Sequence, residues 1–309
     1  MYRVCVAIAL CTALTAAASA WANLADTTPI FAKPTGAPRL RDNAIRLAQQ
    51  DNQPVSTGNP SVAPLKWVGM LINPTPTKKD PNLVSECTGQ FISPNVVLTA
   101  GHCIKDLPDN PTGPWFDLSK QVFILQYQNG EGSQTFKTVC ALTSPRWALP
   151  PNFSSMNDDQ QSAAMRAASE HDFAMVLVNG TSPTGMMPYL LDWKGKVTTA
   201  VRVGYAVDIL DGEIIQQADG IVFFADQIPM FPESPPNLVV HWQSITDLTS
   251  GTSGGAWIAN FSTTEGPNNN LLIAVTSFKN DDYPGAILAA YLTAAEFNPL
   301  LASVSNGCK

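Results

Sequence analysis

One serine in this sequence lies among glycines, in the run Gly251-Thr252-Ser253-Gly254-Gly255-Ala256-Trp257. Glycine weakens the interior of a strand, so such a run suits a tight turn whose backbone takes angles closed to other residues. A turn of this kind can point the amides of Gly251 and Ser253 into one concavity with the serine oxygen at its rim, as in a nucleophile beside an oxyanion hole. The alternative is an ordinary Ser/Gly-rich loop before a strand, because short motifs also match by chance.

A serine hydroxyl is a poor nucleophile near neutral pH and needs a histidine base held by a carboxylate. The chain has three histidines. His102 ends the segment Leu98-Thr99-Ala100-Gly101-His102-Cys103, and Asp172 opens Asp172-Phe173-Ala174-Met175-Val176-Leu177. Taken singly, a histidine beside a cysteine is often structural and an aspartate before a strand is often a cap. His171 and His241 have no motif of their own and are interpreted as structural.

Taken together, the three segments resemble the signature segments of the chymotrypsin-like (trypsin-like) serine peptidases, in that family's order of histidine, aspartate and serine. The resemblance extends from about residue 64 to the C-terminus. It implies that His102 is the general base, that Asp172 orients its ring, and that Ser253 is the nucleophile. The amides of Gly251 and Ser253 would then form the oxyanion hole, and no cofactor or metal would be needed.

The resemblance also implies a primary specificity pocket. Asp247 lies six residues before Ser253, at the position that forms the base of the pocket in trypsin-like enzymes, and Ser277, Phe278, Lys279 and Gly285 would line its walls. A carboxylate at the base would favour Arg or Lys before the scissile bond. Lys279 could instead pair with Asp247 or attract acidic side chains, and a small or apolar preference is the next alternative. No histidine occupies position 276, where the glutamyl branch of the family uses one, so an acidic preference is disfavoured.

One departure from the animal digestive enzymes concerns activation. Those enzymes pair a newly freed terminal amine with an aspartate just before the nucleophile, whereas this chain has Thr252 there. The chain is therefore more similar to the microbial secreted branch of the family, which includes the glutamyl endopeptidases. Activity should not depend on a buried terminal amine.

The first 20 residues have the composition of a secretory signal, with Arg3, an apolar run from Val4 to Ala17, and then Ala18-Ser19-Ala20. The run is too short to span a membrane comfortably, so an exported protein without a membrane anchor is expected. Residues 21–63 are polar and interrupted by prolines, apart from one possible helix at 42–50. This segment could be a removed propeptide or an extended arm lying on the body.

Removing the signal would leave four of the six cysteines and change the formal charge from −7 to about −8, because Cys5, Cys11 and Arg3 lie within it. An even number of cysteines in an exported chain favours disulfides. By the resemblance, Cys87 pairs with Cys103 around the histidine, and Cys140 and Cys308 then pair by exclusion. No Cys-X-X-Cys or His-X-X-X-His spacing occurs, which disfavours a structural metal site. The acidic balance argues against a nucleic-acid partner.

After Pro64 the chain consists of short apolar runs separated by Pro, Gly, Asn and Asp, which predicts an all-β fold. Twelve strands are expected, at Lys66–Ile72, Thr88–Ile92, Asn95–Ala100, Gln121–Tyr127, Thr135–Leu142, Asp172–Val178, Val197–Val203, Gly220–Ala225, Leu238–Gln243, Gly255–Asn260, Leu271–Phe278 and Ala286–Tyr291. They suit two six-stranded antiparallel β-barrels packed face to face, the first at about 64–190 and the second at about 191–309, where a C-terminal helix at Thr293–Val304 closes the chain. The histidine and aspartate fall in the first barrel and the serine in the second, so the site is expected in a cleft between them.

The interruption at Ser144–Glu170 is expected to carry a short surface helix at Met156–Ser169 and to form a wall beside Asp172. The chain is thus predicted to be a secreted, monomeric serine endopeptidase acting on protein or peptide substrates. Two alternatives remain open: a catalytically silent homologue that binds a partner, and an esterase that uses the same triad. No G-X-S-X-G elbow in a βα context is present, which disfavours an α/β-hydrolase.

Overall fold

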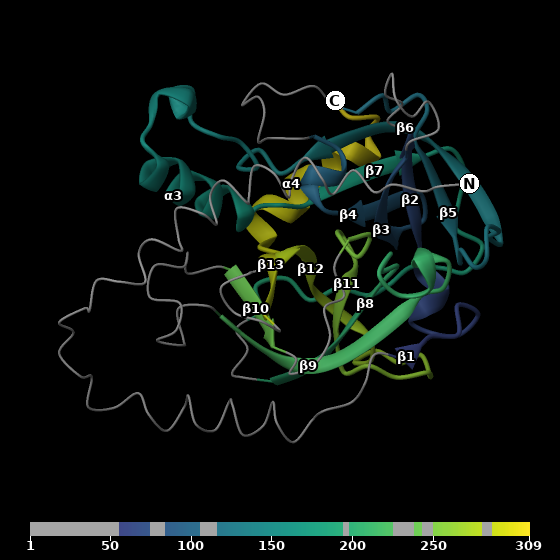
Figure 1. Cartoon of the computed structure of the whole chain (residues 1–309). Helices are drawn as coiled ribbons and strands as arrows, with labels where there is room; N and C mark the ends of the chain where they lie inside the picture. The colour runs from purple at the N-terminus through teal and green to yellow at the C-terminus, as the bar shows by residue number, and fades with distance from the viewer. Residues whose placement is uncertain are drawn as a thin grey trace, which may run out of the picture.

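The computed structural model describes residues 56–74, 84–105, 116–193, 198–224, 238–242, 250–279 and 286–309, without the side chains of 198, 223, 238–242, 279 and 286. The expected signal at 1–20, most of the arm and the possible helix at 42–50 lie outside these residues. The described part is mostly β-structure in two sheets (Figure 1).

The first sheet is a closed barrel of six antiparallel strands in the order β2-β3-β4-β7-β6-β5. Its strands are β2 (Val68–Pro74), β3 (Val84–Ser93), β4 (Val96–Thr99), β5 (Val122–Leu125), β6 (Gln134–Thr143) and β7 (Ala174–Val178). Its interior is aromatic, since the ring of Phe91 packs edge-on against Phe123 and Phe136 at centroid distances of 5.3 and 5.2 Å. A closed barrel has no exposed edge, which suits strands this short.

The second sheet has the order β1-β9-β10-β13-β12-β11-β8, and β8 pairs also with β9, which closes its six longer strands into a ring. The strands are β8 (Thr198–Gly204), β9 (Gln216–Phe224), β10 (Leu238–Trp242), β11 (Ala256–Ala259), β12 (Leu271–Lys279) and β13 (Ala286–Tyr291). All twelve predicted strands are confirmed, with ends shifted by a few residues. The two-barrel architecture is therefore the one expected from the sequence.

The strand β1 (Ser56–Thr57) was not expected. It pairs with Gln216 and Gln217 of β9, and the amide of Gly58 continues the ladder to Ile215 O at 2.8 Å. Alternation of polar and apolar residues cannot reveal a two-residue strand, because the period is too short to be seen. Residues 56–58 of the predicted arm thus lie against the second sheet.

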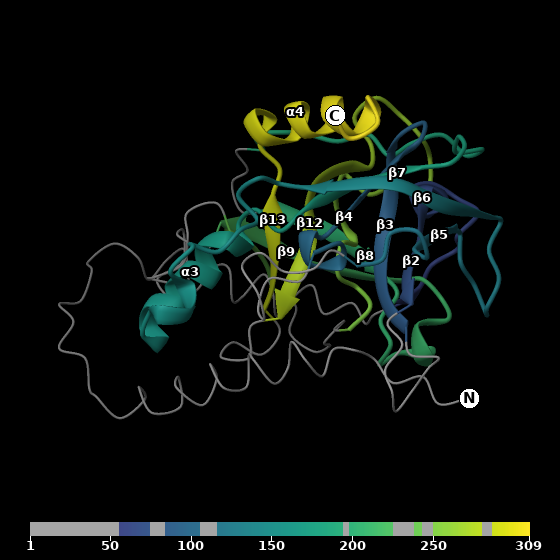
Figure 2. The ribbon, with the colours of Figure 1, turned by 90° about the horizontal axis from the view of Figure 1, so that it is seen from above.

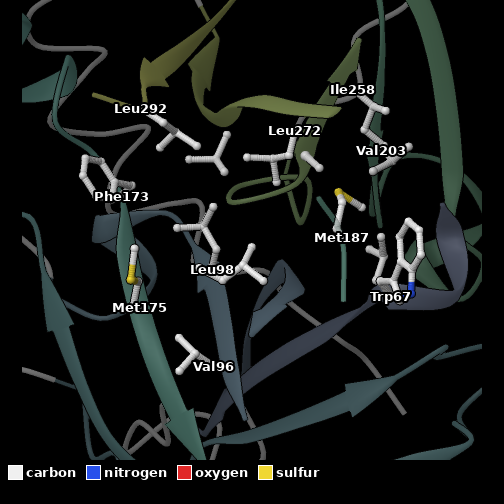
Figure 3. Close-up of a cluster of buried hydrophobic side chains, with 14 of the residues drawn as sticks. Trp67, Val96, Leu98, Phe173, Met175, Met187, Val203, Ile258, Leu272 and Leu292 are labelled. Atoms are coloured by element: carbon white, nitrogen blue, oxygen red, sulfur yellow. The ribbon is translucent and has the colours of Figure 1, made fainter. Parts of the chain in front are cut away.

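The two barrels share one apolar core. Figure 3 shows Leu98, Phe173 and Met175 of the first barrel facing Leu272 and its neighbours in the second. Val203, Ile258 and Leu292 belong to the same cluster, and all of these side chains are buried. Burial of roughly 1.5–3 kcal/mol per large apolar side chain makes this contact an integral part of the fold.

Two α-helices and four 3₁₀ turns complete the described residues: α3 (Asp158–Ser169), α4 (Ala294–Ser305), η1 (Leu65–Trp67), η2 (Gly101–Cys103), η3 (Phe153–Ser155) and η4 (Leu210–Gly212). Helix α4 lies across β6 and β7, with Phe297, Leu300 and Val304 buried (Figures 1 and 2). Helix α3 stands to one side of the strands (Figure 2) and begins after Asn157, which forms a capping box with Gln160. Both helices were predicted. No helix in the described ranges is both long and apolar enough to cross a membrane.

Both predicted disulfides are present, Cys87–Cys103 and Cys140–Cys308. The first joins β3 to η2. The second ties the residues after α4 to β6, so that the C-terminal end of this helix is held on the first barrel.

Candidate active site

His102 is held by the strand before it and the disulfide after it. Strand β4 ends at Thr99, the chain turns through η2, and Cys103 is bonded to Cys87 of the neighbouring strand. The His102 side chain is 12% exposed, so its ring is mostly buried but still reached by solvent.

Asp172 reaches His102 through strand register. In the antiparallel pair β4–β7, Thr99 faces Ala174. Residues just after Thr99 and just before Ala174 therefore emerge at the same end of the barrel, although they are about 70 positions apart in the chain. The sequence motifs predicted this pair, and the ladder explains why they meet.

The Asp172 carboxylate is 1% exposed and accepts three hydrogen bonds. The His102 main-chain N–H donates to Oδ1 at 2.8 Å, the ring Nδ1 lies 2.7 Å from Oδ2, and the Ser277 hydroxyl also donates to Oδ2. A carboxylate at this distance fixes the hydrogen on Nδ1, which leaves Nε2 with a lone pair that can accept a proton. The dyad is thus arranged for base chemistry at Nε2.

Ser253 is half-buried in the turn before β11, and that turn requires its glycines. Gly251 and Gly254 have φ of +87° and +81°. A Cβ on Gly251 would lie 2.1 Å from Tyr205 O, and one on Gly254 would lie 2.2 Å from Thr99 Oγ1. The turn is therefore pressed against strand ends of both barrels, where no larger residue fits.

The turn at residues 250–255 lies beside the histidine, and it is called the nucleophile turn after the role expected of Ser253. Ser253 O accepts a hydrogen bond from Thr88 N at 2.8 Å, and Cys103 Sγ is 3.9 Å from the same oxygen. Thr88 follows Cys87 in the chain, and Cys103 follows His102 and is bonded to Cys87. The fold therefore brings the serine of the second barrel to the dyad of the first.

The two expected oxyanion donors lie on peptide groups whose carbonyls are bonded. Gly251 N shares a peptide plane with Ser250 O, which accepts from Val207 N at 2.9 Å, and Ser253 N shares a plane with Thr252 O, which accepts from Gly255 N at 2.9 Å. The N–H and C=O of a trans peptide point in opposite directions. Both N–H groups are therefore held facing away from these contacts.

The predicted pocket residues are only partly within the described structure. Asp247, Gly285 and the side chain of Lys279 lie outside it. Phe278 is half-buried on β12 beside the register shift between Thr276 and Phe278. Ser277 is 4% exposed, and its hydroxyl is used by Asp172. Its side chain therefore supports the dyad, a role that the sequence did not suggest.

The insertion between β6 and β7 supplies a wall beside His102. Trp147 is 4% exposed, its ring lies 6.4 Å from that of His102, and its Nε1–H donates to Lys105 O at 3.1 Å. Trp147 also packs with Leu149, Phe153, Met165 and Ala168 in a small core of the insertion's own. The prediction that this segment lines the site is consistent with that placement.

His171, next to Asp172, pairs with helix α4. Its Nδ1 is 3.0 Å from Glu296 Oε1, and Glu296 Oε2 accepts from the Ser144 hydroxyl at 2.7 Å. Burial by itself raises the pKa of Glu296, but the hydrogen bonds from His171 and Ser144 and the charge of Arg146 outweigh it and leave that pKa below its usual value. This network fits the structural role expected of His171. The side chain of His241 lies outside the described residues.

Within the described ranges, one cluster of potential metal ligands occurs, formed by Cys87, His102 and Cys103. Both sulfurs are in the disulfide, and only a thiolate ligates metal well. This cluster therefore does not suit a metal ion.

Sequence reasoning did not find Thr88, Gln90 or Trp147, all of which touch the site. Thr88 N–H and the Gln90 side chain bond carbonyls of the nucleophile turn, at Ser253 and Gly254. The only available signal was that Thr88 and Gln90 are polar residues in the predicted strand Thr88–Ile92, which ends in the apolar pair Phe91 and Ile92. Polar residues at buried positions indicate specific hydrogen bonds, but not with which partner.

No family model and no curated protein sequence matches this chain. Solved structures do match. The thermostable serine protease AL20 from an extremophilic microorganism is 19% identical with a TM-score of 0.57, and the match covers 78% of this chain and 98% of that one. This chain has the chymotrypsin-like serine protease fold.

Two further structures show how varied the proteins with this fold are. A Glu endopeptidase in complex with MPD is 17% identical at a TM-score of 0.55, covering 82% of this chain and 96% of its own. An inactivated protease paralogue of the scabies mite is 13% identical at a TM-score of 0.55, covering 78% and 96%. Because proteases and an inactivated paralogue share the chymotrypsin-like fold, function must be argued from the site.

Proposed function

We propose that this protein is a serine endopeptidase that hydrolyses peptide bonds with His102, Asp172 and Ser253. The observation that carries the proposal is the buried Asp172 carboxylate, which holds His102 by both its main-chain and its ring N–H while the glycine-bounded Ser253 lies alongside. A histidine held at Nδ1 by a buried carboxylate and placed near a half-buried serine is the arrangement expected of a general base.

The chemistry follows from these positions. Ser253 Oγ attacks the carbonyl carbon of the scissile bond as His102 Nε2 takes its proton, and the amides of Gly251 and Ser253 bind the resulting oxyanion. His102 then gives the proton to the leaving amine, which yields an acyl-enzyme. A water molecule repeats the sequence and releases the acid. Each oxyanion donor contributes roughly 3 kcal/mol in comparable sites.

The test is replacement of Ser253 by alanine. We expect Ser253→Ala to abolish casein hydrolysis and labelling by a fluorophosphonate while the thermal transition is unchanged, because the side chain contributes little packing. Ser305→Ala, on the exposed side of α4, is the matched control and should behave as the parent. An alanine variant that cleaves as well as the parent would show that Ser253 is not the nucleophile.

The same reagents separate the two alternatives. A catalytically silent homologue would not be labelled at Ser253, whereas an esterase would be labelled and would hydrolyse a short-chain nitrophenyl ester but not casein. The silent alternative is kept because one of the matching structures is an inactivated protease paralogue from the scabies mite.

We also propose that the protein is exported as a monomer. The two disulfides are compatible with an oxidising compartment, and the composition of residues 1–20 favours a cleaved signal. N-terminal sequencing of the exported protein is expected to give Trp21 if cleavage follows Ala20, or Asn23 if cleavage follows the second Ala-X-Ala site, Ala20-Trp21-Ala22. An uncleaved Met1 in the exported form would contradict a signal peptide.

For specificity, we propose a preference for Arg or Lys before the scissile bond, with Asp247 as the base of the pocket. The support is the position of Asp247 six residues before Ser253. A buried, unpaired carboxylate is costly, and a cationic substrate side chain would neutralise it. The segment Thr276–Lys279 and Gly285 would form the walls.

Matched peptides ending in Arg, Glu, Leu and Ala test this preference, with the parent and Asp247→Ala. We expect the variant to lose Arg cleavage by about 10²-fold or more, the range a lost charge partner gives, while Leu and Ala cleavage changes little. Equal Arg cleavage by both proteins would remove Asp247 from the pocket. A parent that prefers Ala or Leu would favour the small or apolar alternative.

A further inference from the structure

Thr88, on β3 of the first barrel, contacts three segments of the chain that surround the nucleophile. It is fully buried. Its hydroxyl donates to Gly251 O at 2.8 Å and accepts from Tyr205 N at 3.0 Å, and its main-chain N–H donates to Ser253 O at 2.8 Å. Its own carbonyl accepts from the Thr99 hydroxyl at 2.8 Å, which ties it to the end of β4 before His102.

Every carbonyl from Ser250 to Gly254 is bonded, and the first barrel supplies three of the five donors. Main-chain amides of the second barrel bond Ser250 O and Thr252 O. The first barrel bonds the other three, with the Thr88 hydroxyl on Gly251 O, the Thr88 amide on Ser253 O, and Gln90 Nε2 on Gly254 O at 3.2 Å. Thr88 therefore controls two of the five peptide planes.

The Thr88 hydroxyl bonds the carbonyl of the Gly251–Thr252 peptide, which lies between the two peptides that carry the N–H groups of Gly251 and Ser253. Gly251, at φ +87°, has no Cβ to restrict the rotation of this peptide plane. If this plane turned, the N–H groups of Gly251 and Ser253 would no longer converge on one point. Thr252 is buried and carries no charge, so the turn is held without the ion pair to a terminal amine expected of the animal digestive enzymes.

We propose that Thr88 is a positioning residue for catalysis, whose hydroxyl holds the Gly251–Thr252 peptide so that the two oxyanion amides stay aligned. This inference rests on the proposed peptidase function. A hydroxyl suits the task because it donates and accepts at once, which satisfies Gly251 O and Tyr205 N together. The device is uncharged and is complete as soon as the barrels pack, so no proteolytic cut is needed to align the amides.

The experiment compares Thr88→Val with Thr88→Ser. Valine keeps the shape but leaves a buried carbonyl and a buried amide without their partner, whereas serine keeps both hydrogen bonds. Thr138→Val is the matched control, because it removes one hydroxyl that bonds Gln121 in the first barrel, away from the nucleophile turn. The three variants and the parent are assayed for kcat, KM, thermal transition and inhibition by a peptide aldehyde, whose covalent adduct places an oxyanion in the hole.

We expect Thr88→Val to lower kcat by about 10²-fold, the effect of losing one oxyanion donor, with KM within about threefold of the parent. Aldehyde affinity should fall in parallel, and Thr88→Ser should restore both to within about threefold of the parent. Thr138→Val should leave kcat unchanged. A merely structural role would lower the thermal transition in Thr88→Val without changing kcat or aldehyde affinity, and that outcome would overturn the inference.

Two controls keep the outcomes distinct. If Thr88→Val does not fold, Thr88→Ala takes its place, because the space it leaves lets a water reach both backbone groups. A parent that is not labelled by fluorophosphonate would overturn the proposed function itself. A labelled parent whose Thr88→Val variant is equally active would overturn only the role of Thr88.

Discussion

At the scale of single residues, the site depends on neighbours whose side chains go to different partners. Thr276 and Ser277 are adjacent on β12. The Thr276 hydroxyl accepts from Trp257 Nε1 at 2.9 Å in the core of the second barrel, while the Ser277 hydroxyl donates to Asp172 of the first. Ser277 is the unpaired residue at the register shift between Thr276 and Phe278, and a bulge of this kind re-aims a side chain, so one strand can bind its own core and the dyad at once.

Tyr205 offers a test of how closely the barrels pack at this point. Its ring stacks edge-on against Tyr127 at 5.8 Å, and its hydroxyl is buried without a hydrogen bond, unlike that of Tyr127, which donates to Glu213 Oε2 at 2.8 Å. Burial, with a smaller contribution from Tyr127, raises the pKa of Tyr205 well above its usual value, so the hydroxyl stays neutral.

We predict that Tyr205→Phe is at least as stable as the parent, because it removes a buried polar atom that has no partner. Tyr127→Phe should lose about 1 kcal/mol, because it breaks a hydrogen bond and leaves Glu213 with one donor fewer. Urea unfolding of both variants measures the difference. A Tyr205→Phe variant less stable than Tyr127→Phe would mean that a water or another group satisfies the Tyr205 hydroxyl.

At the scale of elements, helix α4 contacts both ends of the insertion that precedes Asp172. Glu296 of α4 bonds His171 and Ser144, which lie at the two ends of the insertion, and Arg146 Nη1 approaches the same carboxylate at 3.6 Å. The helix thus closes the base of the insertion, and Trp147, three residues after Ser144, packs beside His102.

The lowered pKa of Glu296 gives this contact a pH dependence. A carboxylate whose pKa is lower in the folded state stabilises fully above its unfolded value of about 4.3, and the stabilisation is lost as the pH falls through the folded pKa. We predict that Glu296→Gln lowers Tm at pH 7 by about 2–4 °C, a modest value because the group is partly hydrated. The difference from the parent should shrink as the pH is lowered below about 4. Glu265→Gln, at an exposed pair with Lys66, is the control and should show little effect at either pH.

The two disulfides differ in what they hold. Cys140–Cys308 spans 168 positions and Cys87–Cys103 spans 16, so the chain-entropy model assigns them about 5 and about 3 kcal/mol. We predict that Cys140→Ala/Cys308→Ala loses more stability but keeps kcat within about threefold. Cys87→Ala/Cys103→Ala should instead lose more activity, because this bond lies beside His102 and the carbonyl of Ser253. Denaturant midpoints and kcat measured on both pairs decide it, and the reverse order of activity loss would show that the shorter disulfide does not position the histidine.

At the scale of the whole molecule, the chain before the first barrel is part of the body from residue 56 onward. β1 extends the second sheet, and Gln126 Nε2 donates to Pro60 O at 2.7 Å from the first barrel. Ala63, Leu65 and Trp67 are each 5% exposed or less and belong to the core that the two barrels share. This segment therefore joins the barrels.

We predict that a protein starting at Ser56 keeps the kcat and Tm of the form that begins at residue 21. A protein starting at Val68 should be strongly destabilised, because two large apolar side chains worth roughly 1.5–3 kcal/mol each are removed from the core. Activity and thermal melting of the two truncations test this. If only a cut at one site within 23–66 switches on activity, the arm is an inhibitory propeptide.

The sequence by itself determined the fold class, the twelve strands, both helices and both disulfides. Apolar alternation is a local signal and predicted the strands and helices, and the even cysteine count favoured disulfides, while the family resemblance supplied their pairing. It also identified His102 and Asp172, which the structure brings together, and Ser253, which lies beside them. The resemblance in three separate motifs predicted that these three residues lie together, which no single motif could predict.

Only the tertiary structure decided which residues support the site. Ser277 on Asp172, Thr88 and Gln90 on the nucleophile turn, and Glu296 on His171 are partners separated by 105 to 164 positions. A polar residue in a buried strand indicates that a hydrogen-bond partner exists, but the surrounding sequence does not show which residue that partner is. Strand register and the packing of one barrel on the other bring the partners within 3 Å or so, and those are properties of the folded chain alone.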